Sequence, residues 1–97
     1  MEARIENFSS WIAYRSDDSH KGEIEQLLRE AGFTILNSME HAFDPQGYTA
    51  LWLLAESHCA LHTFPEEKKT YVELSSCNIA MYVKFVQLFH QHYHAIH

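Results

Sequence analysis

The sequence predicts an α+β fold in which one β-sheet is covered on one face by two helices. Short stretches in which apolar and polar residues alternate, as they do in strands, occur in both halves of the chain. Two other stretches, one after the first predicted strand and one at the C-terminal end, place apolar residues at helical spacing. Strands that follow one another directly, with helices gathered in two places, are typical of α+β proteins. The expected order is β-α-β-β-β-α, with one further extended piece before the last strand.

The first half of the chain predicts two strands joined by a helix. Residues 8–15 alternate, so that side chains point to opposite faces of the strand. A polar turn at 16–19 offers residues that cap helices, and a helix is expected over 21–31. Gly32 stands where a left-handed residue would end this helix, and 33–43 forms the second strand. The helix would bury one apolar stripe, made of Ile24, Leu27, Leu28 and Ala31.

The second half predicts a run of strands and a final helix. The turn at 44–47 is a strong signal, because proline presets one backbone torsion and glycine accepts positive φ. A strand at 48–55 and an extended piece at 58–64 follow, and after a turn the alternation at 70–75 indicates another strand. The last helix begins near residue 78 and would carry Ile79, Tyr82, Val83, Val86, Phe89 and Tyr93.

Composition limits the kind of protein. Ninety-seven residues make one domain, 1–97, with a core small enough that a homodimer is expected. The net charge of −6 disfavours nucleic acid and anionic membrane surfaces as partners. No apolar run spans a bilayer and the first residues lack a signal peptide's apolar region, so we expect a cytoplasmic protein. The two cysteines do not make a disulfide framework.

One stretch, 55–66, concentrates reactive side chains. An acid, a hydroxyl, two imidazoles and a thiol lie between Glu56 and His62. The hydroxyl of Ser57 is adjacent in sequence to the carbonyl group of Glu56, and it can attack that carbonyl if the backbone bends there. We therefore interpret the Glu56–Ser57 peptide bond as a site of self-cleavage.

Residues 41–77 resemble the prokaryotic-type S-adenosylmethionine decarboxylases. The family carries E-S-H-x-x-I-H-T-W-P-E, which matches 56–66, and F-H-x-F-x-P-x-G-V-S-G upstream, which matches 40–50. Its F-T-C-G motif matches 75–78, where this chain has Ser-Ser-Cys-Asn. The resemblance implies a dimeric enzyme with helices on one face of a sheet. It also implies a decarboxylase of S-adenosylmethionine that supplies the aminopropyl donor for spermidine synthesis.

The resemblance assigns a role to each site residue. The chain would be cut between Glu56 and Ser57, and Ser57 would become a pyruvoyl group that forms a Schiff base with the substrate. His62 would transfer protons during processing, and Cys77 would return a proton to the substrate. Thr49, in the place of a serine, would assist processing. The predicted adenine contacts are the aromatic residues Phe43 and Phe64.

The chemistry adds one geometric demand and leaves alternatives open. His62 is five residues beyond Ser57, so contact between them requires a bend in the chain, whereas Thr49 could reach the oxyanion from the neighbouring hairpin strand. No metal is required, although the histidine-rich tail with His90, His94 and His97 could bind one if it is not simply solvated. Cys59 is interpreted as a core residue.

Two other functions remain open. The chain could be a family member that no longer processes itself and acts as a binding or regulatory protein, since Thr49 replaces a smaller serine. It could also be a pyruvoyl decarboxylase of another amino acid, such as arginine or ornithine, because Phe64 replaces a tryptophan.

Overall fold

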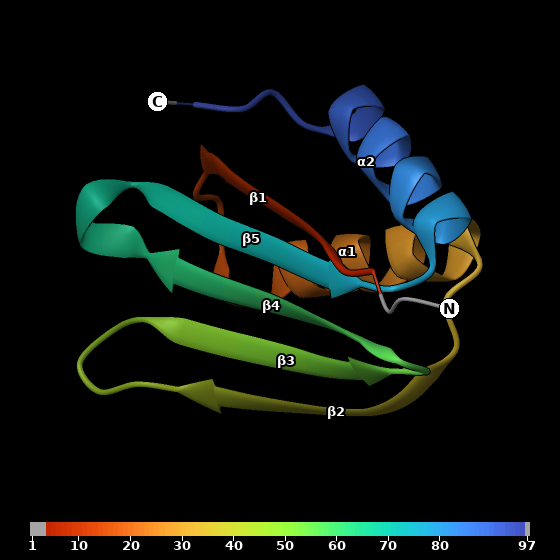
Figure 1. The fold of residues 1–97 in the computed structure, drawn as a ribbon. Coiled ribbons are helices and arrows are strands. Elements are labelled where there is room, and N and C mark those ends of the chain that lie inside the picture. Colours follow the sequence, from red (N-terminus) through yellow and green to blue (C-terminus); the bar gives the residue numbers. More distant parts are fainter. Residues whose placement is uncertain (1–3, 97) are drawn as a thin grey trace.

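The fold is known from a computed structural model, which describes residues 4–96, without the side chains of 17–19. Five strands form one antiparallel sheet with the spatial order β1-β5-β4-β3-β2 (Figure 1). The elements in chain order are β1 (Glu6–Ala13), α1 (Asp17–Ala31), β2 (Ile35–Ala42), β3 (Tyr48–Leu54), β4 (Ser57–Phe64), the short 3-10 helix η1 (Pro65–Glu67), β5 (Lys69–Ser76) and α2 (Ile79–His92). The predicted α+β class and the two helices are confirmed.

The two ends of the sheet carry different connections. The short turn between β3 and β4 lies at one end, and the connections from β2 to β3 and from β4 to β5 lie at the other (Figure 1). The extended piece predicted at 58–64 is a full strand, β4, at the centre of the sheet. Its hydrogen-bonded partners run from Leu54 opposite Ser57 to Tyr48 opposite Thr63 on β3.

The core fills the space between one face of the sheet and both helices. Trp52, Leu61 and Val72 of the sheet are at most 1% exposed. The helices contribute Ile24 and Leu28 from α1 and Phe85 and Phe89 from α2, all of them fully buried. Each such side chain contributes about 1.5–3 kcal/mol through burial. One continuous core therefore holds both helices on the same face of the sheet.

The local signals placed the elements well, with a correction in each helix. Helix α1 begins at Asp17 after the N-cap Ser16, so residues 17–19, predicted as part of a turn, belong to its first turn. Gly32 ends α1 with φ 102°, in the left-handed region that glycine accepts. Of the apolar residues expected on α2, Phe89 is fully buried and Val83 is 45% exposed, and Phe85, which was not among them, is fully buried. The face of α2 that carries the two phenylalanines packs against β1 and α1.

The opposite side of the sheet is left uncovered by the helices, and we call it the open face. Alternation along the strands places on it large side chains that a solvated sheet seldom carries. The exposed fraction is 67% for Met39, 41% for Leu51 and 55% for Leu53. The same face carries two histidines of β4, His58 and His62.

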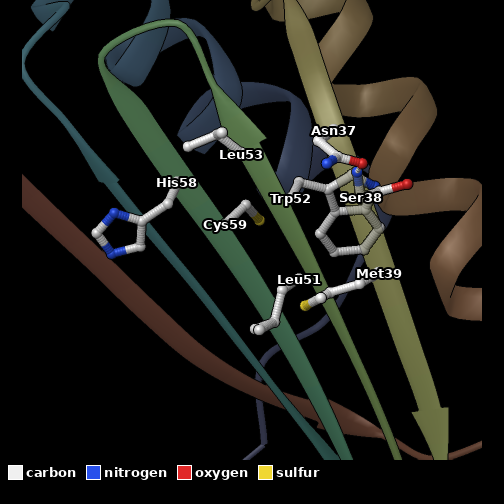
Figure 2. A pocket seen from close by; sticks show the side chains of 8 residues that line it. All are labelled: Asn37, Ser38, Met39, Leu51, Trp52, Leu53, His58 and Cys59. Atoms are coloured by element: carbon white, nitrogen blue, oxygen red, sulfur yellow. Dashed lines mark hydrogen bonds between the residues drawn. The ribbon is translucent and has the colours of Figure 1, made fainter.

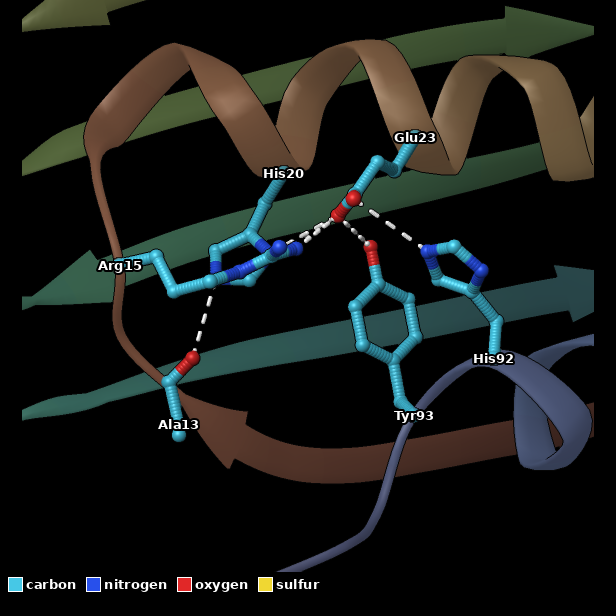
Figure 3. Close-up of polar contacts among 6 residues, drawn as sticks. All are labelled: Ala13, Arg15, His20, Glu23, His92 and Tyr93. Atoms are coloured by element: carbon cyan, nitrogen blue, oxygen red, sulfur yellow. Dashed lines mark hydrogen bonds and ion pairs between the residues drawn. The ribbon is translucent and has the colours of Figure 1, made fainter.

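A polar cluster joins the two helices where α1 begins and α2 ends (Figure 3). The Glu23 carboxylate accepts hydrogen bonds from Arg15 and, at 2.7 Å, from the Tyr93 hydroxyl, and His92 lies 3.3 Å away. Buried His20 lies between Ala13 and Arg15, 3.0 Å from the Ala13 carbonyl. Burial lowers the pKa of His20, while its hydrogen bond to Ala13 opposes that shift. The cluster stabilises the contact between the start of α1 and the end of α2.

Candidate active site

The Glu56–Ser57 peptide bond lies in the two-residue turn between β3 and β4. Leu54 and Ser57 face each other as the last pair of the ladder, so the backbone reverses direction through residues 55 and 56. Glu56 has φ 57°, in the left-handed region that non-glycine residues rarely adopt. Such a conformation costs roughly 1 kcal/mol and persists only where neighbours enforce it. The bend that self-cleavage requires is therefore present at this bond.

A thiol lies against the same peptide bond. Cys77 follows β5, and its Sγ donates to the Glu56 carbonyl oxygen at 3.3 Å. The Glu56 carboxylate is also near this sulfur, with Oε2 at 3.6 Å. An S–H donor directed at a carbonyl oxygen withdraws electron density from the carbonyl carbon, which favours nucleophilic attack there.

The Ser57 side chain is buried beneath this turn. It is 8% exposed, and its hydroxyl donates to the Ser76 hydroxyl at 2.8 Å. A cavity of about 420 Å³ adjoins it, which we call the junction cavity. Its lining residues include Leu53, Glu56, Ser57, His58, Ser76 and Cys77. The predicted residues Glu56, Ser57 and Cys77 thus come together in one concave site.

The remaining predicted site residues gather at the other end of the sheet. Thr49 Oγ1 and His62 Nδ1 are 2.9 Å apart across the β3–β4 pair. They line a second cavity of about 300 Å³ together with both predicted adenine contacts, Phe43 and Phe64. We call this the distal cavity. Phe43 is 51% exposed, so its ring remains available to a ligand.

The predicted contact between Ser57 and His62 is wrong within one chain. Strand β4 runs unbroken from Ser57 to Phe64, so the expected bend between them is absent. Five residues of extended strand separate the two Cα atoms by roughly 16 Å. Side chains five positions apart also point to opposite faces, so Ser57 faces the core while His62 faces the open side. Thr49, which pairs with His62, is equally remote from the Glu56 carbonyl.

Aromatic side chains that the sequence analysis did not assign surround His62. The Tyr71 ring stacks on the imidazole with centroids 6.3 Å apart, and Trp11 packs against Tyr71 at 5.0 Å. Trp11 also contacts Phe64, and it carries Lys69 over its ring at 4.5 Å. Trp11, Tyr71 and His62 form one cross-strand row in the register of β1, β5 and β4, and Phe64 and Lys69 pair two positions further along. The register between these strands was the signal that would have predicted the contacts.

A third cavity, of about 410 Å³, lies over β2, β3 and β4 (Figure 2). It is bordered by Met39, Leu51 and Leu53 from the open face and by His58 of β4. Apolar surface therefore continues from the junction cavity, which Leu53 and His58 also line, toward the middle of the sheet. The part of the open face over β2 and β3 therefore offers a ligand or a partner an apolar surface, whereas the part over β1 and β5 carries polar residues such as Ser9, Glu73 and Ser75.

Two other sequence expectations can be placed. Cys59 is 1% exposed, as predicted, and burial raises the pKa of its thiol well above the ordinary range, so this thiol remains protonated. In the tail, His90 packs edge-on against Phe8. His97 lies outside the described residues, and among the described ones no three His, Cys, Asp or Glu side chains converge as metal ligands. Neither described helix has the length and apolar character to cross a membrane.

Known proteins match this chain in sequence. The family described as S-adenosylmethionine decarboxylase matches residues 15–96. A protein of Parasynechococcus marenigrum named S-adenosylmethionine decarboxylase proenzyme is 49% identical over 54 residues, which are 56% of this chain and 42% of that protein. A protein of the same name from Methanococcus aeolicus is 31% identical over 71 residues, 69% of this chain and 61% of that protein. The chain thus spans about half the length of these relatives.

The fold also matches a solved structure. The adenosylmethionine decarboxylase from Aquifex aeolicus aligns with a TM-score of 0.69 and 21% sequence identity. The alignment covers 86% of this chain and 73% of that one. At this identity the match supports the arrangement of sheet and helices.

Proposed function

Because the chain belongs to the S-adenosylmethionine decarboxylase family, we propose that it is a self-processing, pyruvoyl-dependent decarboxylase of S-adenosylmethionine. One observation carries the proposal: the Glu56–Ser57 bond lies in a tight turn, with Glu56 at φ 57° and the Cys77 thiol on its carbonyl oxygen. The product would be the aminopropyl donor for spermidine synthesis. Both cysteines are free thiols, which suits a reducing compartment such as the cytoplasm.

Self-cleavage would begin with attack of Ser57 Oγ on the Glu56 carbonyl carbon. The C–N bond breaks, the amide nitrogen gains the hydroxyl proton, and an ester links the two residues. Cys77, whose Sγ lies 3.3 Å from the carbonyl oxygen, would stabilise the oxyanion, a task that the sequence analysis had given to Thr49. Removal of the Ser57 α-proton then breaks the Cβ–Oγ bond, releases the Glu56 carboxylate and leaves a dehydroalanine. This tautomerises to an imine, which water hydrolyses to the pyruvoyl ketone and ammonia.

The residues around Ser57 fit the pyruvoyl group that these cleavage steps would leave at position 57. The junction cavity is large enough to admit the amino-acid end of a substrate beside residue 57, and it holds one thiol and one carboxylate. When present, the group supplies an electron sink for decarboxylation. Cys77, exposed at the edge of the cavity, would donate the proton that replaces the lost carboxylate.

We propose further that the active enzyme is a homodimer whose two open faces meet. The apolar side chains of this face need a cover, and a face of five strands, each about eight residues long, offers on the order of 600 Å² per partner. A two-fold axis that lies between the sheets and crosses the strands would put the junction cavity of one chain over the distal cavity of the other. The partner's His62 and Thr49 would then approach the Glu56–Ser57 bond through the junction cavity, which is lined by Leu53 and His58 of the open face as well as by Ser57. Phe43 and Phe64 of the partner subunit would be the adenine contacts.

The test is the mass of the freshly purified chain, followed by turnover. Fragments 1–56 and 57–97, the second blocked by a pyruvoyl group, and release of carbon dioxide from carboxyl-labelled S-adenosylmethionine are expected. A Ser57→Ala chain should remain intact and inactive. A wild-type chain that never splits would sink the proposal.

A second candidate is a non-processing binding protein. It is favoured by the buried Ser57 hydroxyl and by the remoteness of His62 within one chain. Calorimetry distinguishes the two, because this candidate binds S-adenosylmethionine as an intact chain and releases no carbon dioxide.

A further inference from the structure

Two buried hydroxyl groups face each other at the end of the sheet where the chain would be cut. Ser57 of β4 and Ser76 of β5 are cross-strand partners, 8% and 1% exposed. The Ser57 hydroxyl donates to Ser76 Oγ over 2.8 Å. Since a buried hydroxyl gains little from water, this bond decides which of its three staggered rotamers Ser57 adopts.

Ser76 is itself held by the backbone of the β5–α2 junction. Its oxygen accepts from the Asn78 amide at 3.0 Å, and its own proton points at the Asn78 carbonyl, 3.4 Å away. Asn78 is anchored in turn, because its side chain caps α2 by accepting from the Met81 amide at 3.0 Å. The acceptor for the Ser57 hydroxyl is therefore fixed by the start of a helix that packs in the core.

We propose that Ser76 is a positioning residue for the self-cleavage of the Glu56–Ser57 bond. With its proton directed at Ser76, the Ser57 oxygen has lone pairs free for the Glu56 carbonyl carbon. Cys77, the next residue, polarises that carbonyl from its oxygen side. The end of β5 thus holds nucleophile and electrophile together through two consecutive side chains. This inference rests on the proposed self-processing.

The role of Ser76 is confined to processing. During cleavage Ser57 Oγ becomes part of the new Glu56 carboxylate. The mature enzyme therefore lacks the hydroxyl that donates a hydrogen bond to Ser76. Loss of the Ser76 hydroxyl should therefore slow cleavage even at temperatures where the uncleavable Ser57→Ala, Ser76→Val chain is fully folded. A residue needed only for folding would slow cleavage only where that chain begins to unfold.

The experiment compares Ser76→Thr with Ser76→Val, which have similar volumes and differ in the hydroxyl. Cleavage is followed by intact mass after refolding, at a temperature where the uncleavable Ser57→Ala version of each variant is fully folded. Ser76→Thr should cleave within about threefold of wild type and Ser76→Val about tenfold more slowly or worse, the loss expected for one hydrogen bond. Thr70→Val removes another buried hydroxyl from the same face of β5 and should cleave normally.

Each other outcome has a definite meaning. If wild type does not split, the proposed function fails before this inference is reached. If wild type splits and Ser76→Val keeps pace or accelerates, or if Ser76→Thr is equally slow, the positioning role is overturned. A slowing of Ser76→Val that appears only where its uncleavable version begins to unfold overturns it as well. If thermal melting of the uncleavable Ser57→Ala, Ser76→Val chain shows that the Ser76→Val substitution prevents folding, Ser76→Ala replaces Ser76→Val in the comparison.

Discussion

Mixing two inactive chains should restore cleavage if the site is shared between subunits. A Ser57→Ala chain cannot be cut. A His62→Ala chain should be cut about 10²–10⁴-fold more slowly than wild type, because a proton-transfer group usually contributes that much to the rate. Within one chain the residues lie roughly 16 Å apart on opposite faces of β4. In a mixed dimer, however, the His62→Ala chain supplies Ser57 and its partner supplies His62.

The magnitude follows from random pairing. About half of the dimers are mixed, and each has one intact site of two, so roughly one quarter of the wild-type sites are restored. Co-expression with different tags and intact-mass analysis should show about half of the His62→Ala chains split. No Ser57→Ala chain should split. His94→Ala, an exposed tail variant, serves as the control and should split alone. Full splitting of His62→Ala alone, or none in the mixture while wild type splits, would refute the shared site.

Three further predictions concern single residues. Cys77→Ala should cleave at least about tenfold more slowly than wild type, because it lacks the only side-chain donor described on the Glu56 carbonyl oxygen. Intact mass over time measures the cleavage rate, and equal rates would show that Cys77 does not stabilise the oxyanion. Thr70→Val should raise the free energy of unfolding by about 1 kcal/mol in urea titrations, because Thr70 Oγ1 is buried without a hydrogen-bond partner; a loss of stability would contradict this. Burial lowers the pKa of His20 in the folded chain, so as the pH falls below 6.5 the unfolded chain binds a proton at His20 before the folded chain does. Between pH 7.5 and 5.5 the urea midpoint of wild type should therefore fall by more than that of the His20→Gln variant. Equal falls in the two proteins would refute this.

Much of the fold was predictable because its signals are local. Alternation placed the strands, and Gly32 marked the end of α1 with the positive φ that only glycine adopts cheaply. The face of α2 was less predictable, since apolar residues surround much of that helix. Only packing against β1 could select Phe85 over Val83, and a helical wheel does not contain that information.

The sequence identified residues of the candidate site but not all of their contacts. The backbone bends at Glu56 as the sequence interpretation required, and the Cys77 thiol lies against the same peptide bond. Ser76 was missed because the predicted strand stopped at residue 75, one residue before the pairing with Ser57 that gives it a role. Register sets such contacts, and register depends on strands distant in the sequence.

The separation of Ser57 from His62 follows from the geometry of a strand. Two strand positions whose numbers differ by an odd number carry side chains on opposite faces, and a difference of five also sets them beyond any side chain's reach. The reactive run 56–62 therefore cannot form one site on its own strand, however dense it looks in sequence. If both ends act on one bond, a second copy must bring its distal end to the first copy's junction. The apolar side chains on the open face, Met39, Leu51 and Leu53, lie between the two ends, where that second copy would bind.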